Sequence, residues 1–115
     1  MKTLEILRSA RALVDTPEKW TWGTIARDAS GRSVPFDSPS AVCFCAYGAV
    51  SAACDHGASG SAAWCRLREA LPAGWPGGVS LYNDYPSTMH ADILALFDRA
   101  IEAEETAIKA LDTPA

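Results

Sequence analysis

Three things are missing from this 115-residue sequence, and each absence excludes a class of protein. It has no run of about 20 apolar residues, the length that a membrane-spanning helix needs, so we expect no membrane partner. It has no surplus of positive charge, because the net charge is −4 and the ten Lys and Arg residues are scattered. Nucleic-acid binding is therefore disfavoured. It also lacks the common phosphate-loop, nucleophile-elbow, zinc-protease and calcium-loop motifs, so the sequence names no reaction and we expect no cofactor.

What is present is enough apolar material for one core. Apolar residues make up 49% of the chain, which predicts a folded single domain over residues 1–115 rather than a disordered segment. Near the N-terminus, Lys2, Glu5 and Arg8 interrupt the apolar stretch that a signal peptide would need. We therefore expect a cytoplasmic protein whose four cysteines are free thiols.

Hydrophobic periodicity predicts four helices. Apolar residues recur at helical spacing in each, and proline, glycine or small polar residues separate them. The predicted helices span about residues 3–14, 39–55, 62–71 and 89–111. The helix over 39–55 carries few charges and many small residues, so we expect it at the centre of the fold. Because loops and turns lie between the helices, an orthogonal array is favoured over an up-down bundle.

A small β element is expected beside these helices. Residues 20–36 contain alternating and turn-forming segments that are typical of a short hairpin, and Val79–Tyr82 alternates like one extended strand. A single helical turn could begin at Pro17. The sequence therefore predicts a mainly α domain with a two- or three-stranded β element from 20–36 and 79–82.

The cysteines do not predict a metal site. Zinc needs about four ligands at the corners of a tetrahedron. On the predicted central helix, Cys43 and Cys45 would point roughly 200° apart, and Cys54 would lie about 16 Å from Cys43 along the axis. Cys65 and His56 are further candidate ligands, but we interpret the thiols as small apolar packing residues.

A catalytic cysteine is the sharper alternative. Cys45 would be the nucleophile, with His90 as its base and Asp84 or Asn83 to orient the histidine. The predicted helix argues against this arrangement, because Cys45 would lie about two turns from the helix N-terminus, where the dipole is weak.

Ligand-binding candidates gather in the irregular segments. Asn83 and Asp84 lie between a predicted strand and a helix N-terminus, where polar residues can line a pocket or can simply bond their own turn. Tryptophans in loops can likewise line a pocket or cover the core. The candidates for binding a ligand or partner are Trp20, Trp22, Trp75, Tyr82, Asn83 and Asp84.

The order of these features resembles a known family. A Leu-rich N-terminal helix and a Trp pair are followed by Ala-x-x-x-Cys-Ala-x-Gly-Ala from Ala41, by Asn83–Asp84 and by Ala-Asp-Ile-Leu-Ala-Leu-Phe-Asp-Arg-Ala-Ile over 91–101. This pattern is similar to a family of small, functionally uncharacterised bacterial and phage proteins, in which Trp often stands where this chain has Tyr82. The resemblance implies a bacterial or phage source and no particular activity.

Two functions remain open at this point, with a third that concerns assembly. The absence of catalytic motifs favours a non-enzymatic protein that binds an unknown protein or small molecule. The alternative is a small cysteine-dependent hydrolase or transferase that uses Cys45. The chain could also act as a subunit of a homo-oligomer, if the last helix leaves an apolar face exposed.

Overall fold

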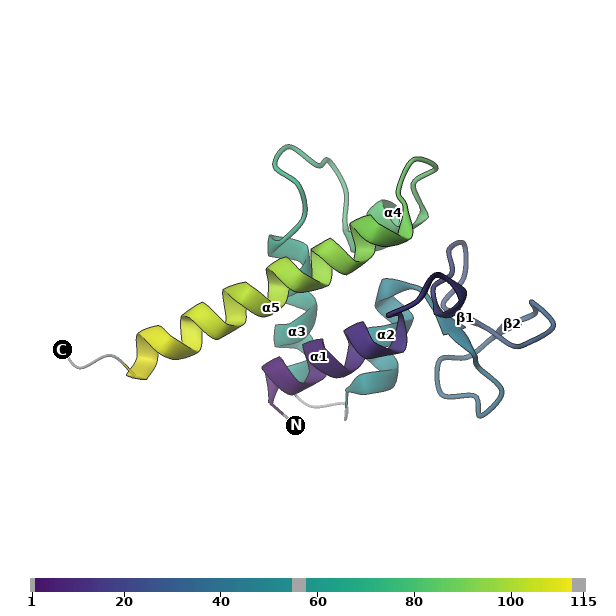
Figure 1. Ribbon diagram of the computed structural model, residues 1–115, viewed down its shortest axis with the longest axis horizontal. Helices are drawn as coiled ribbons and strands as arrows, with labels where there is room; N and C mark the ends of the chain where they lie inside the picture. Colours follow the sequence, from purple (N-terminus) through teal and green to yellow (C-terminus); the bar gives the residue numbers. More distant parts are fainter. Residues whose placement is uncertain (1, 55–57, 113–115) are drawn as a thin grey trace.

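Helices carry most of the fold, and a small sheet lies at one end (Figure 1). The computed structural model describes residues 2–54 and 58–112. Within these residues the helices are α1 (Thr3–Leu13), α2 (Ala46–Ala53), α3 (Ala58–Glu69), α4 (Val79–Asp84) and α5 (His90–Asp112), with one 3₁₀ turn, η1 (Pro17–Lys19). The strands are β1 (Ala26–Arg27), β2 (Ser33–Val34) and β3 (Cys43–Phe44). The predicted class, mainly α with a small β element, is confirmed. None of the described helices has the length and apolar character that a membrane crossing requires.

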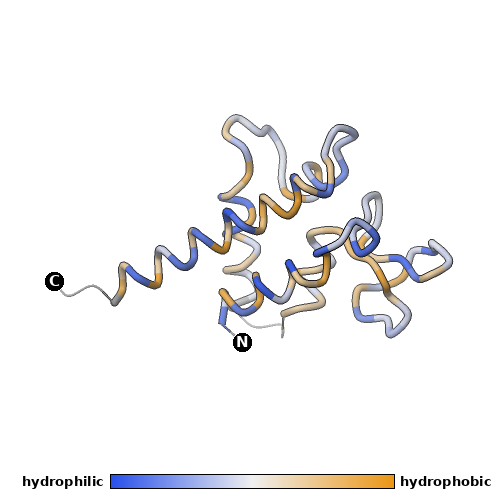
Figure 2. The backbone as a smooth tube through the Cα atoms, in the orientation of Figure 1, coloured by the Kyte–Doolittle hydropathy of each residue, from blue (hydrophilic) through white to orange (hydrophobic). Residues whose placement is uncertain are grey.

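The core lies where α1 meets the other long helices. α1 contacts α2, α3 and α5, and its Ile6, Leu7 and Ala10 are fully buried. α2 contributes small residues, Ala46 and Ala49, which let neighbouring backbones approach closely. The hydropathy colouring alternates along α1 and α5, as expected for helices with one apolar and one polar face (Figure 2).

α5 is longer than the body that it packs against. Ile93, Leu96 and Phe97 are buried in its first half, whereas Leu111 near its end is 85% exposed. Its C-terminal part extends away from the other helices (Figure 1). Ion pairs join α5 to the other helices, from Arg8 to Glu105, from Arg11 to Asp98 and from Arg66 to Glu104.

The sheet is antiparallel, with β1 between β2 and β3. Ala26 lies opposite Val34 on one side and Phe44 on the other. The β1–β2 turn is held by Asp28, whose carboxylate accepts from the Ser30 hydroxyl and the backbone amides of Ser30 and Arg32. These bonds, with the Ser30 hydroxyl first, lower the pKa of Asp28. The predicted hairpin within 20–36 is confirmed.

The predicted helix over 39–55 is wrong in its first half. Residues 43–44 form β3, and the helix begins only at Ala46. The amide of Val42 donates to the Arg27 carbonyl and that of Cys45 to the Ile25 carbonyl, so pairing with β1 keeps this segment extended. α2 also approaches β1 closely, because a Cβ on Gly48 would lie 2.2 Å from the Ile25 carbonyl oxygen.

The predicted strand over 79–82 is also wrong. Residues 79–84 form helix α4, which begins after Gly78. Val79 and Asn83, four residues apart, are its buried residues and therefore share one face. The third strand of the sheet comes instead from 43–44. The other helices match their predictions within a few residues, and the single turn at Pro17 is present as η1.

Candidate functional site

Asn83 is the best-connected buried polar side chain in the described part of the chain. It is 1% exposed, on the inner face of α4. Its Oδ1 accepts from the indole Nε1 of Trp20 at 2.8 Å and from the backbone amide of Ala46, in the first turn of α2, at 3.0 Å. Its Nδ2 donates to the Thr21 carbonyl at 3.1 Å. One side chain thus joins α4, the N-terminus of α2 and the segment between η1 and β1.

Asp84 extends this network to the surface. Its Oδ1 accepts from Asn83 Nδ2 at 2.9 Å and from the backbone amide of Gly23 at 3.0 Å. Gly23 has a φ of 80°, a left-handed conformation that favours glycine. The turn at Gly23 and the end of α4 therefore hold the carboxylate from two sides.

A pocket of about 340 Å³ opens beside these two residues. We call it the Asn83 pocket, and it is lined by Trp20, Trp22, Asn83, Asp84, Tyr85, Pro86 and Thr88. Four of the six sequence-derived binding candidates lie in this lining, although they come from segments about 60 residues apart. Tyr85 was expected from the sequence to share a site with Asn83 and Asp84, whereas Pro86 and Thr88 were not anticipated as lining residues.

The two remaining candidates lie next to the pocket rather than in it. The Trp75 ring makes edge-on contacts with Tyr82 and with Tyr85, each with ring centroids 5.2 Å apart. Trp75 Nε1 donates to the Gly78 carbonyl at 3.2 Å. Trp75 therefore supports one wall of the pocket through Tyr85.

Cys45 lies at the N-terminus of α2, not two turns inside a helix as the sequence suggested. It is the N-cap residue, and its Sγ accepts from the Gly48 amide at 3.3 Å. Burial raises the pKa of this thiol, backbone hydrogen bonds from Gly48 and Tyr47 offset part of that rise, and the charge of Asp84 adds to it. The thiol form is therefore favoured despite the helix N-terminus.

The structure does not assemble the postulated catalytic group. His90 Nε2 donates to the Val14 carbonyl at 2.7 Å, and its ring packs against Trp20 with centroids 6.1 Å apart. Asp84 is bonded to Gly23 and Asn83. Among the described residues, no hydrogen bond joins any two of Cys45, His90 and Asp84.

The cysteines are arranged differently from the helical prediction. Cys43 lies in β3 and Cys45 two residues later in extended backbone, so the side chains no longer diverge as they would on a helix. Cys43 Sγ instead donates to the Arg27 carbonyl. Across residues 2–54 and 58–112 there is no group of three or more His, Cys, Asp or Glu residues that could hold a metal ion. His56 lies outside the described residues.

A family model matches residues 1–103, which is most of the chain and includes every residue that lines the Asn83 pocket. The chain belongs to a family of unknown function (DUF6197). The expected membership of a family of unknown function is thereby confirmed. No curated protein and no solved structure matches the chain significantly. The DUF6197 match carries no activity to this chain, so the function must be argued from its own residues.

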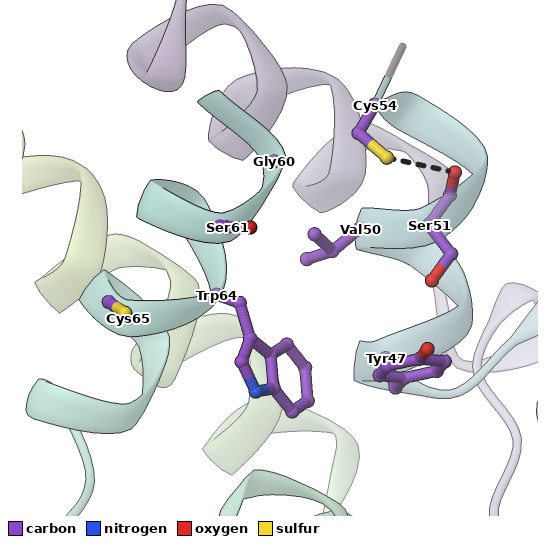
Figure 3. A pocket seen from close by; sticks show the side chains of 8 residues that line it. All are labelled: Tyr47, Val50, Ser51, Cys54, Gly60, Ser61, Trp64 and Cys65. Atoms are coloured by element: carbon purple, nitrogen blue, oxygen red, sulfur yellow. Dashed lines mark hydrogen bonds between the residues drawn. The ribbon is translucent and has the colours of Figure 1, made fainter. Parts of the chain in front are cut away.

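A second pocket, of about 400 Å³, lies between α2 and α3 (Figure 3). We call it the Trp64 pocket, and it is lined by Tyr47, Val50, Ser51, Cys54, Gly60, Ser61, Trp64 and Cys65. The rings of Tyr47 and Trp64 meet edge-on with centroids 5.1 Å apart. The bond from Cys54 Sγ to the Ser51 carbonyl stays within one helical turn. None of the binding candidates identified from the sequence lies in this lining.

Proposed function

We propose that this protein is a non-enzymatic binding protein and that its ligand enters the Asn83 pocket. The observation that carries the proposal is the convergence of two tryptophans, a buried amide and an oriented carboxylate on one pocket. Small-molecule sites combine apolar and aromatic walls with a few fixed polar groups in this way.

The rigidity of the polar groups supports binding. Asn83 is held by donors and acceptors from three separate segments, and Asp84 is fixed by two donors. Groups that are already ordered lose little conformational entropy when a ligand arrives. The volume of about 340 Å³ suits a small molecule or one inserted side chain of a protein partner.

A ligand-observed NMR screen tests this proposal. The probe is a mixed set of amino acids, nucleosides, sugars, organic acids and alkylammonium compounds, screened by saturation transfer against the unmodified protein. We expect at least one compound to bind, to lose binding in Trp22→Ala and to retain it in Trp64→Ala. Trp22 is 62% exposed, so its removal leaves the core intact. Binding that survives Trp22→Ala but not Trp64→Ala would overturn the assignment to the Asn83 pocket.

Cysteine chemistry at Cys45 is the second candidate function. One observation favours it, because the Gly48 amide at the start of α2 points at Sγ. Burial and Asp84 raise the pKa of the thiol and oppose it. If the protein only binds, iodoacetamide at neutral pH will modify Cys45 more slowly than the half-buried Cys54 and Cys65. A Cys45 that reacts far faster than both would favour a hydrolase or transferase instead.

The proposed setting is the cytoplasm of a bacterium, or of a bacterium that carries a phage. The sequence resemblance points to such a source, and all four cysteines are free thiols, which suits a reducing compartment. Fractionation of a source organism with an antibody against the protein tests the compartment.

A further inference from the structure

We infer that the ligand of the Asn83 pocket carries an organic cation, an alkylammonium or a guanidinium group. This inference rests on the proposed function and specifies the chemistry of its ligand. It starts from the charge of the lining, in which Asp84 is the sole charged side chain and no Lys or Arg takes part.

The carboxylate of Asp84 is positioned but not neutralised. Its Oδ1 is bonded to Gly23 and Asn83, both uncharged donors. Among residues 2–54 and 58–112, no ion pair includes Asp84 and no donor bonds to its Oδ2. One oxygen of a fixed, negatively charged acceptor therefore stays available to a ligand.

Arg27, whose guanidinium lies close to Gly23, is already used by other partners. Arg27 donates from Nε to Thr21 Oγ1 at 2.9 Å, from Nη1 to the Gly31 carbonyl at 3.1 Å and from Nη2 to the Trp22 carbonyl at 3.2 Å. These bonds hold the guanidinium against the backbone of the hairpin. His90 packs against Trp20 and donates to the Val14 carbonyl, so its Nε2 is also bonded to a group other than Asp84. Neither side chain therefore occupies the position that the cation of a ligand would take beside Asp84.

The aromatic walls complete a site for a cation. The faces of tryptophan rings attract ammonium and guanidinium groups more strongly than those of tyrosine or phenylalanine. Trp20 and Trp22 both line the pocket, together with Tyr85. Trp20 is locked by its bond to Asn83. An indole pair beside an unneutralised carboxylate favours a cation over a neutral or anionic ligand of the same size.

Calorimetric titration with matched probes tests whether the pocket prefers a positively charged ligand. Choline is compared with 3,3-dimethylbutan-1-ol, its uncharged carbon analogue, and N-acetyl-arginine methylamide with the corresponding citrulline. We expect at least one cation to bind about fivefold more tightly than its neutral analogue. Preference for choline would indicate a free ammonium compound, whereas preference for blocked arginine would indicate the side chain of a protein partner.

Asp84→Asn tests the carboxylate with little change of shape. We expect the cation to lose about fivefold in affinity and the neutral analogue to be unaffected. Asp37→Asn is the matched control, because Asp37 is an exposed carboxylate outside the pocket lining and its loss changes the net charge equally. In the unmodified protein, raising NaCl from about 20 to about 300 mM will lower the affinity for the cation but not the affinity for its neutral analogue.

The outcomes separate the two proposals. Equal affinity for cations and neutral analogues, an unchanged affinity in Asp84→Asn, or a preference for organic acids would overturn the cation inference. The proposed binding function would survive those results, since a ligand would still enter the pocket. If neither these probes nor any compound of the mixed set binds, the proposed function itself fails.

Discussion

The Asn83 pocket and the Trp64 pocket are similar in size and in having tryptophan walls, but they are built differently. In the Asn83 pocket, hydrogen bonds join Trp20, Gly23 and Ala46 to residues at the end of α4, far away in the sequence. In the Trp64 pocket, the bond from Cys54 to Ser51 stays within α2. A hollow between packed helices can arise from imperfect packing alone, whereas converging polar groups need long-range constraints. This difference is why we place the ligand in the Asn83 pocket although the other is larger.

The largest expected effect comes from removing the centre of that network. Asn83→Ala leaves the Trp20 indole, the Ala46 amide and the Thr21 carbonyl without their buried partner. We expect a loss of about 3 kcal/mol in the free energy of unfolding, measured by urea denaturation. Ser61→Ala, in the lining of the Trp64 pocket, is the control and should cost less than about 0.5 kcal/mol. Similar losses in both variants would remove the contrast between the pockets.

Two glycines of the helices compare the packing of α2 against β1 with the packing at the Trp64 pocket. Gly48→Ala would place a Cβ 2.2 Å from the Ile25 carbonyl oxygen, a backbone atom that can move only with β1. We expect a loss of about 2 kcal/mol. A Cβ on Gly60 would meet the Cys54 side chain at 3.1 Å.

Because a contact at 3.1 Å requires a shift of only a few tenths of an ångström, Gly60→Ala should stay within about 1 kcal/mol of the unmodified protein, helped by the helix propensity of alanine. Thermal unfolding of both variants checks this. A Gly60→Ala variant as unstable as Gly48→Ala would show that the Trp64 pocket is equally constrained.

Two tryptophan variants isolate one hydrogen bond. Trp20→Phe removes the indole N–H that donates to Asn83, and we expect it to cost about 1 kcal/mol more than Trp64→Phe. Trp64→Phe keeps an aromatic ring opposite Tyr47, at a half-buried position. Chemical denaturation followed by circular dichroism measures both. Equal costs would mean that lost ring volume, rather than the bond to Asn83, determines the effect of Trp20→Phe.

The smallest effect concerns pH. The pKa of Cys45 is raised by burial above its ordinary value of 9.0, so the unfolded chain loses this proton first as pH rises. Stability contributed by the buried thiol is complete below about pH 9 and falls as pH rises towards the folded-state pKa. Cys45→Ala should therefore lose less stability between about pH 8 and 10 than the unmodified protein. Equal pH profiles for the two proteins would contradict the effect of burial.

Much of the helical frame could be predicted from the sequence because long amphipathic helices have a clear period. α1 and α5 follow that period, and their bounds match. The segment over 39–45 could not be predicted in this way, because a short apolar run fits either a strand or a buried helix. Pairing of Val42 and Cys45 with the β1 segment determines the outcome, and those bonds depend on residues 15 and 20 positions away.

The candidate site was predictable in part. The tryptophans and Asn83–Asp84 were identified as polar and aromatic residues in irregular segments, and the structure brings four of them to one pocket. Which of these residues lie together depends on helix α4, but the alternating pattern of Val79–Tyr82 predicted a strand there. The spacing of Val79 and Asn83, four residues apart, was the available signal for a helix that turns Asn83 inward.

The most direct test is to follow the four indole N–H signals in a ¹H–¹⁵N spectrum while a binding compound from the mixed set is added. If the account holds, the signals of Trp20 and Trp22 shift in proportion to occupancy and that of Trp64 stays in place. A shift of Trp64 with Trp20 and Trp22 unmoved would contradict it, and would place the ligand between α2 and α3.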